Sequence, residues 1–337
     1  MSHNPPAQMR AVRINALGPE FSGCSVDMIN TPTPGPDEVL VRICASAVGF
    51  PDLLMTEGKY QHKPDLPFTP GGDISGEVVA WGANVENFTV GDAVVVMHAR
   101  GGFAEYGVFP AESLRPKPAA LSFAEAAAFG SAYLTAYVSL VRRAHLSAGE
   151  WVLVHGAAGG VGLAAVDLAL ALGARVIAAS ASDDKLAVVN EKYSPDATVS
   201  VENGFREEVK RITDGGADII YDPVGGDIFD ESTRCIAFDG RLLVIGFTSG
   251  RIATVPTNIP LIKGFSVVGV RAGEYGRRFP ERGRENLDAI WKLADAGKLQ
   301  PHVHAEVALE NWRDAFNAIR NRAVIGRVVM APFGSST

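Results

Sequence analysis

The chain has 337 residues, of which 47% are hydrophobic and 20% charged, with a formal net charge of −7. This length suits two domains, and the mild acidity without a basic stripe argues against nucleic acid as a partner. The three cysteines lie far apart and no signal-peptide core or bilayer-length apolar run is present, so we expect a soluble cytoplasmic protein with neither disulfides nor a metal cluster.

The first third of the chain consists of short β-type runs between glycine- and proline-rich turns. Strands are predicted at Glu38–Val48, Gly76–Gly82 and Asp92–His98. Asp52 follows Phe50 and Pro51, where it is expected to cap a short helix. Many short strands of this kind indicate a barrel-like β domain.

From Ser122 the sequence becomes helical, with Ser122 and Glu125 in the spacing of a capping box. After Gly149 strands and helices alternate, which predicts a parallel sheet with helices on both faces. The predicted strands are residues 151–156, 175–180, 197–201, 217–225, 240–247 and Phe265–Val270, and the helices are Val161–Leu172, Asp184–Lys192, Phe205–Thr213 and Ile228–Ala237. The tail is expected to hold helices Arg284–Ala296 and Glu310–Asn321, a charged loop at 279–286, and β-like segments at 303–309 and 326–331.

A glycine-rich turn, "GAAGGVG" from Gly156 to Gly162, joins the first of these strands to a helix. Glycine permits positive φ, and its missing Cβ lets a diphosphate approach the backbone at the positive end of the helix. Ala157 stands where the first glycine of G-x-G-x-x-G belongs, and a glycine turn without a ligand is the alternative. The backbone contacts expected for a dinucleotide are Ala158, Gly159, Gly160 and Val161.

The second strand of this unit ends at Ser180, where an acid would bind the ribose 2′-hydroxyl of NADH. Ser180 and Ser182 can donate hydrogen bonds to a 2′-phosphate, and Lys185 can supply positive charge. The sequence therefore favours NADPH, although Asp183 and Asp184 lie close by and weigh against that preference.

Several motifs in order along the chain carry a family resemblance: "GKYQHKPDLPFTPGGDISGEV", "GSAYLTAYVSL", "VLVHGAAGGVGLAAVDLA", "GADIIYDPVGG" and "GRLLVIGF". From Gln8 to Ala331 the chain resembles the zinc-independent, zeta-crystallin-like quinone oxidoreductase branch of the medium-chain dehydrogenase/reductase superfamily. The resemblance implies an α/β protein with a chaperonin-10-like (GroES-like) β-barrel catalytic domain of residues 1–130 and 273–337. It also implies a Rossmann domain with a doubly wound parallel sheet at 131–272, and an active site in the cleft.

The resemblance further implies NADPH-dependent reduction of quinones or α,β-unsaturated carbonyls in a homodimer or homotetramer, with the last Rossmann strand pairing across the dimer. Zinc-dependent relatives carry Cys at the position of Gly49 and His at that of Gly72, together with a four-cysteine lobe. Because this chain has none of these, no zinc site is expected. Many quinone reductases carry Asn at the position of Gly49, so a polar role there is in doubt.

Reduction of an enone or quinone builds negative charge on oxygen, which calls for a hydrogen-bond donor. Tyr60 and Arg271 are the catalytic candidates, and Gly49, Phe50, Tyr60 and Tyr275 are the expected substrate-pocket residues. Thr135, Gly246, Phe247, Val270, Arg271 and Arg327 complete the expected cofactor contacts, beside the turn and the serine pair. The plainer alternatives are a rim tyrosine for Tyr60, a core aromatic for Phe50, a back-bonding helix residue for Thr135 and a surface arginine for Arg327.

Two other functions remain open at this stage. An enoyl-thioester reductase would need basic residues for a CoA or carrier tail, and Arg277, Arg278 and Arg282 could supply them. A non-catalytic NADPH-binding protein, resembling the crystallin-like or vesicle-protein-like relatives, would keep the nucleotide fold without turnover.

Overall fold

The computed structural model describes residues 5–334 and divides the chain into two compact units. One unit, here called the β-rich unit, is the chain up to Ser131 together with the chain from Pro301 onward; the other, the α/β unit, is Ala132–Gln300. The expected return to the catalytic domain at residue 273 is corrected to Pro301. The physical reason is that Arg142, in the α/β unit, donates hydrogen bonds to Asn286 and Glu285 and so ties the segment after 273 to that unit.

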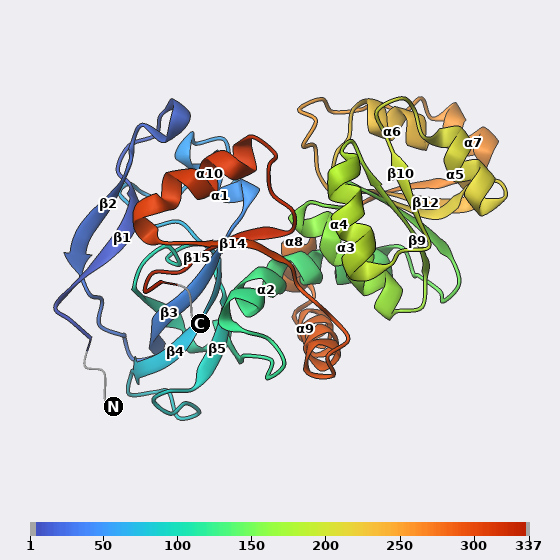
Figure 1. Cartoon of the computed structure of the whole chain (residues 1–337). Coiled ribbons are helices and arrows are strands. Elements are labelled where there is room, and N and C mark those ends of the chain that lie inside the picture. Colours follow the sequence, from blue (N-terminus) through green and yellow to red (C-terminus); the bar gives the residue numbers. More distant parts are fainter. Residues whose placement is uncertain (1–4, 335–337) are drawn as a thin grey trace. The chain divides into compact units, whose positions relative to one another are not determined.

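The β-rich unit is built on a seven-stranded sheet in the order β14-β15-β3-β4-β5-β7, with β6 also paired to β3 and with β1 and β2 as a separate pair (Figure 1). Its strands are β1 (Gln8–Ile14), β2 (Cys24–Asn30), β3 (Glu38–Val48), β4 (Asp73–Trp81), β5 (Ala93–Met97), β6 (Tyr106–Pro110), β7 (Leu114–Pro116), β14 (Val303–Val307) and β15 (Arg327–Met330). Its helices are α1 (Phe50–Thr56) and α10 (Trp312–Arg320), and α2 (Phe123–Tyr137) begins in it. The predicted strand Glu38–Val48 is confirmed to the residue, and β4 begins three residues earlier than predicted because Asp73 already pairs with Ala47.

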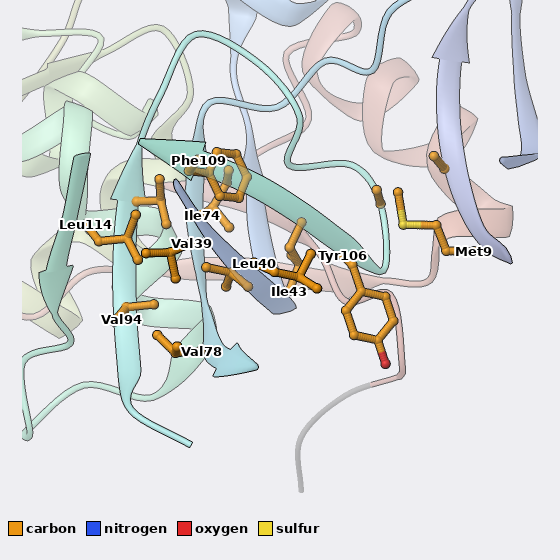
Figure 2. Packing of buried hydrophobic residues seen from close by; sticks show 14 of the residues in the cluster. Met9, Val39, Leu40, Ile43, Ile74, Val78, Val94, Tyr106, Phe109 and Leu114 are labelled. Carbon is orange, nitrogen blue, oxygen red and sulfur yellow. The ribbon is translucent and has the colours of Figure 1, made fainter. Parts of the chain in front are cut away.

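The main core of the β-rich unit is formed by buried apolar side chains of its strands, as Figure 2 shows. The labelled side chains that converge there are Met9, Val39, Leu40, Ile43, Ile74, Val78, Val94, Tyr106, Phe109 and Leu114. Each fully buried aliphatic side chain contributes about 1.5–3 kcal/mol. Val39, Leu40 and Val41 are consecutive in β3 and each is buried, so both faces of this strand are covered where it pairs with β4 and β6.

A second core joins the C-terminal return to the start of the chain. Phe316 of α10 packs edge-on against Phe21, with ring centroids 5.2 Å apart, and against Trp312 at 5.3 Å. In Figure 1 the red helix α10 accordingly lies beside the blue helix α1. Because Phe21 and Phe316 lie about three hundred residues apart in sequence, their T-shaped pair holds distant segments of the chain together.

The α/β unit contains a six-stranded sheet in the order β10-β9-β8-β11-β12-β13, with every pairing parallel. In order of appearance this is 3-2-1-4-5-6, the order of dinucleotide-binding Rossmann sheets, so the predicted doubly wound parallel sheet is confirmed. The strands are β8 (Trp151–His155), β9 (Arg175–Ser180), β10 (Ala197–Ser200), β11 (Ala217–Asp222), β12 (Ile236–Val244) and β13 (Ser266–Gly269). The helices are α3 (Gly160–Ala171), α4 (Asp183–Tyr193), α5 (Arg206–Thr213), α6 (Asp227–Ser232), α7 (Asn258–Lys263), α8 (Ala272–Arg278) and α9 (Pro280–Asp295).

Both faces of this sheet are covered. Val152, Leu153 and Val154 are consecutive in β8, so their side chains alternate between the faces, yet each is 0% exposed. The continuous apolar run of β8 therefore follows from burial on two sides.

Two predicted elements are corrected, and the predicted capping box is confirmed. The helix predicted to reach Ala237 ends at Ser232, because Ile236 is already paired with Ala217 in the sheet. The predicted charged loop at 279–286 belongs mostly to α9, which begins at Pro280, a residue suited to the first turn of a helix. At the start of α2, Ser122 and Glu125 exchange backbone-to-side-chain hydrogen bonds.

Within residues 5–334 no helix combines the length and the hydropathy needed to span a membrane.

Candidate functional site

The glycine turn after β8 has the conformation that its glycines make possible. Gly156 has a φ of +56°, so the left-handed position falls on it and not on Ala157, which explains why alanine is accepted there. A Cβ on Gly162 would lie 2.2 Å from the carbonyl oxygen of Gly156. Glycine at position 162 therefore lets the turn pack directly against the first turn of α3.

The N-terminus of α3 is open. Gly159 is its N-cap with a φ of −81°, and among the described residues no side chain caps this end and no acid lies in its first turn. The N–H groups of Gly160, Val161 and Gly162 have no intrahelical acceptor, as at every helix start. Together with the positive end of the helix dipole they form an arrangement that can bind a diphosphate.

Two more strand ends border this turn. A Cβ on Gly156 would lie 3.5 Å from both Pro223 and Val224, which follow β11. The buried carboxylate of Asp222 accepts hydrogen bonds from the backbone N–H groups of Val224 and Gly225, and burial raises its pKa. Thr248, just beyond β12, donates its N–H to the carbonyl of Pro223. The carboxyl ends of β8, β11 and β12 thus lie side by side at one edge of the sheet, where ligands of such sheets bind.

The predicted 2′-phosphate residues lie together at the end of β9. The Ser182 N–H donates to the Ser180 hydroxyl at 3.3 Å, and the Ser182 hydroxyl accepts from the Lys185 N–H at 3.4 Å as the N-cap of α4. Burial lowers the pKa of the half-buried Lys185 ammonium, whereas Asp183 and Asp184 are exposed. The structure brings the serines and Lys185 into one turn, and their contact with a phosphate stays a prediction.

The remaining predicted cofactor contacts in the α/β unit follow other elements. Gly246 and Phe247 come directly after β12, and Phe247 is exposed. The N–H of Val270 donates to Val244, and Arg271 is the N-cap of α8. Thr135 lies in α2, where its carbonyl accepts from the Ser139 hydroxyl at 2.6 Å. Tyr275, on α8, packs against Phe279 with its ring tilted by 53° and accepts a hydrogen bond from Arg282.

In the β-rich unit, Gly49 adjoins a buried carboxylate. Asp52 is 5% exposed and accepts hydrogen bonds from the N–H groups of Gly49 at 2.8 Å and Gly71 at 3.0 Å. Its expected role as a cap is confirmed, because it holds the N-cap residue of α1. Burial raises the pKa of Asp52 to about 6, against the opposing effects of the two N–H donors and of Arg327.

Arg327 is not a surface residue. Its guanidinium binds Asp73 at 2.8 Å, and the two side chains are only 11% and 12% exposed. Asp73 also accepts the backbone N–H and the hydroxyl of Ser131. A Cβ on Gly49 would lie 3.7 Å from the Arg327 guanidinium, so this ion pair borders the position predicted to face the substrate. Apart from its place after "PGG", nothing in the sequence around Asp73 indicates that it pairs with this arginine.

The two aromatic candidates of this unit differ in environment. Tyr60 is half-buried, and its ring packs against the second core described above, which includes Phe316. Phe50, the first residue of α1, is 47% exposed, so the alternative of an ordinary core aromatic is wrong. Their contacts with a substrate stay predictions.

The donor set does not fit a zinc ion. A Cβ on Gly72 would lie 2.4 Å from the carbonyl oxygen of His98, so this position has no room for a liganding side chain. Across residues 5–334 no group of three or more His, Cys, Asp or Glu side chains could hold a metal ion. No chemical step is therefore assigned to a metal.

Comparisons with known proteins agree with this architecture. Residues 35–119 match the family model for the alcohol dehydrogenase GroES-like domain, and residues 160–291 match that for zinc-binding dehydrogenase. The chain is 40% identical to a quinone oxidoreductase-like protein 2 homolog of Nematostella vectensis, over 95% of this chain and 88% of the relative. It is 30% identical to human quinone oxidoreductase, over 96% and 97% of the two chains. A mycobacterial protein solved in complex with NADPH superposes with a TM-score of 0.86 and 27% identity, covering 96% of this chain and all of the other.

Proposed function

Because this chain belongs to the quinone oxidoreductase-like branch of the medium-chain dehydrogenase/reductase superfamily, we propose that it is an NADPH-dependent, zinc-independent reductase of quinones or α,β-unsaturated carbonyls. The observation that carries the proposal is the uncapped N-terminus of α3 behind the glycine turn, at the carboxyl edge of a 3-2-1-4-5-6 sheet. The free thiols of Cys24, Cys44 and Cys235 are all buried and suit the cytoplasm as its compartment.

In the proposed reaction the chemistry that NADPH would supply, when bound, is a hydride for an electron-poor carbon of the substrate. The backbone N–H groups of Gly160 and Val161 bind its diphosphate, while Ser180 and Lys185 bind the 2′-phosphate. The first candidate for the hydrogen-bond donor to the substrate oxygen that gains negative charge is Tyr60, and Arg271 is the second candidate for that role. Proton transfer to that oxygen, directly or from water, completes the reduction.

We expect the protein to bind NADPH at least about tenfold more tightly than NADH and to oxidise NADPH with a quinone or enone acceptor. Fluorescence titration with both nucleotides measures the preference, and absorbance at the reduced nicotinamide band follows turnover with 1,2-naphthoquinone. Preference for NADH would contradict the role of Ser180 and Lys185. Faster turnover of crotonyl-CoA would favour the enoyl-thioester alternative, and tight NADPH binding without turnover of any quinone or enone would indicate a binding protein.

We further propose a homodimer through β13. This strand is the last in the sheet order, so within residues 5–334 no further strand pairs with its outer edge. Large apolar side chains are exposed on β12, α7 and β13, namely Phe238 at 83%, Leu261 at 81% and Val267 at 38%. Light scattering is expected to give twice the chain mass, and Val267→Lys is expected to shift the protein toward the monomer. A wild-type protein that is monomeric at micromolar concentration would contradict this interface.

A further inference from the structure

The chain passes between the two units twice, and neither passage is a free linker. The first crossing, between Ser131 and Ala132, lies inside the continuous helix α2. The second crossing, between Gln300 and Pro301, follows α9 and precedes β14. Both crossings have hydrogen bonds to the same buried side chain of the α/β unit.

That side chain is Asp167, which is 7% exposed on α3. Its Oδ2 atom accepts the hydroxyl of Tyr133 at 2.5 Å, two residues beyond the first crossing. The same Oδ2 accepts the backbone N–H of Gln300 at 2.7 Å, at the second crossing. The carbonyl of Gln300 in turn accepts the hydroxyl of Tyr193, the last residue of α4, at 2.6 Å. A single oxygen atom therefore joins the two crossings.

Asp167 also lies on the helix that begins at the nucleotide site. It is seven residues after Gly160, which corresponds to about 10 Å along a helix axis. Helices transmit small displacements as rigid bodies, since their hydrogen bonds resist axial stretching, and α3 packs on β8, β9 and α4. A shift of α3 on binding a diphosphate would thus reach both crossings through one carboxylate.

We propose that Asp167 is a positioning residue that couples the two chain crossings to each other and to the dinucleotide site. The inference rests on the proposed function, because it assigns the α3 N-terminus to the diphosphate. It predicts that a change at one crossing alters the other. A residue that served packing alone would alter only its own surroundings.

The test is amide hydrogen exchange with and without NADPH, together with steady-state kinetics. Tyr133→Phe removes one bond at the first crossing and is expected to raise exchange of the Gln300 amide about fivefold or more. Tyr221→Phe, which removes another buried tyrosine hydroxyl of the same unit, is the matched control and should leave the Gln300 amide unchanged. Unaltered exchange at Gln300 in Tyr133→Phe, with the control behaving as stated, would overturn the coupling.

Substitutions of Asp167 extend the test. Asp167→Leu removes both acceptor bonds and should abolish the NADPH-dependent protection of residues 298–300, and it should lower kcat about fivefold or more with the NADPH Kd nearly unchanged. Asp167→Asn keeps an acceptor oxygen and is expected to rescue both readouts. If Asp167→Leu does not fold, Tyr193→Phe still tests the second crossing by its effect on exchange near Tyr133. If NADPH does not slow amide exchange at residues 159–161 of the wild type, the proposed function is contradicted. If NADPH slows exchange there, but amide exchange at the two crossings is the same in the wild type and in Asp167→Leu, only the coupling is contradicted.

Discussion

Replacing Gly159 with aspartate is expected to abolish NADPH binding while the fold survives. The new carboxylate would stand at the N-cap of α3, beside the N–H groups proposed to bind the diphosphate. Like charges about 4 Å apart cost about 4 kcal/mol at an effective dielectric constant of 20, which weakens binding on the order of 100- to 1,000-fold. Fluorescence titration measures the loss, and circular dichroism with a thermal melt checks the fold.

The neighbouring glycines provide controls for this prediction. Gly159 has a negative φ, and a Cβ there would meet only the Gly156 carbonyl oxygen, at 3.3 Å, so Gly159→Ala should fold and retain binding within a few fold. Gly162→Ala should instead lower the thermal midpoint, because its Cβ would lie 2.2 Å from the same oxygen. Undiminished NADPH affinity in Gly159→Asp would show that the diphosphate binds elsewhere.

Replacing Arg327 with methionine is expected to lower the free energy of unfolding by about 3–5 kcal/mol. The substitution keeps most of the side-chain volume but leaves the Asp73 carboxylate, 12% exposed, without its cation. The backbone N–H and the hydroxyl of Ser131 would still donate hydrogen bonds to that negative charge. Urea denaturation followed by fluorescence measures the change in the unfolding free energy.

A double-mutant cycle separates the ion pair from packing. Asp73→Asn alone should also destabilise, since it leaves the Arg327 cation without its anion. The double variant Asp73→Asn, Arg327→Met should lose clearly less than the sum of the two single losses, because neither uncompensated charge remains. Strict additivity would mean that the pair does not stabilise the β-rich unit.

Much of the fold could be predicted because local pattern and tertiary structure agree. The alternating strands and helices from Trp151 onward gave the parallel sheet, and the apolar run of Glu38–Val48 gave the central strand of the β-rich unit. Ser122 and Glu125 marked a helix start that the hydrogen bonds confirm. The glycine turn was recognisable because its flanking strand and helix were recognisable.

What could not be predicted depends on contacts between distant residues. Arg327 pairs with Asp73 across 254 positions, and no local pattern distinguishes that arginine from a surface one. The sequence predicts a helix that includes Ile236, but pairing with Ala217 makes this residue part of a strand. The predicted return to the β-rich unit at residue 273 is too early, because the bonds from Arg142 to α9 leave no trace in the local sequence.

The pairing of β15 with β3 has a consequence for synthesis on the ribosome. Val48 is translated long before Val328, its neighbour in the sheet. Until then one edge of β3 and the apolar face completed by Val329 remain without their last partner. The intervening α/β unit draws only on its own continuous stretch of chain, so it can fold before β15 reaches β3.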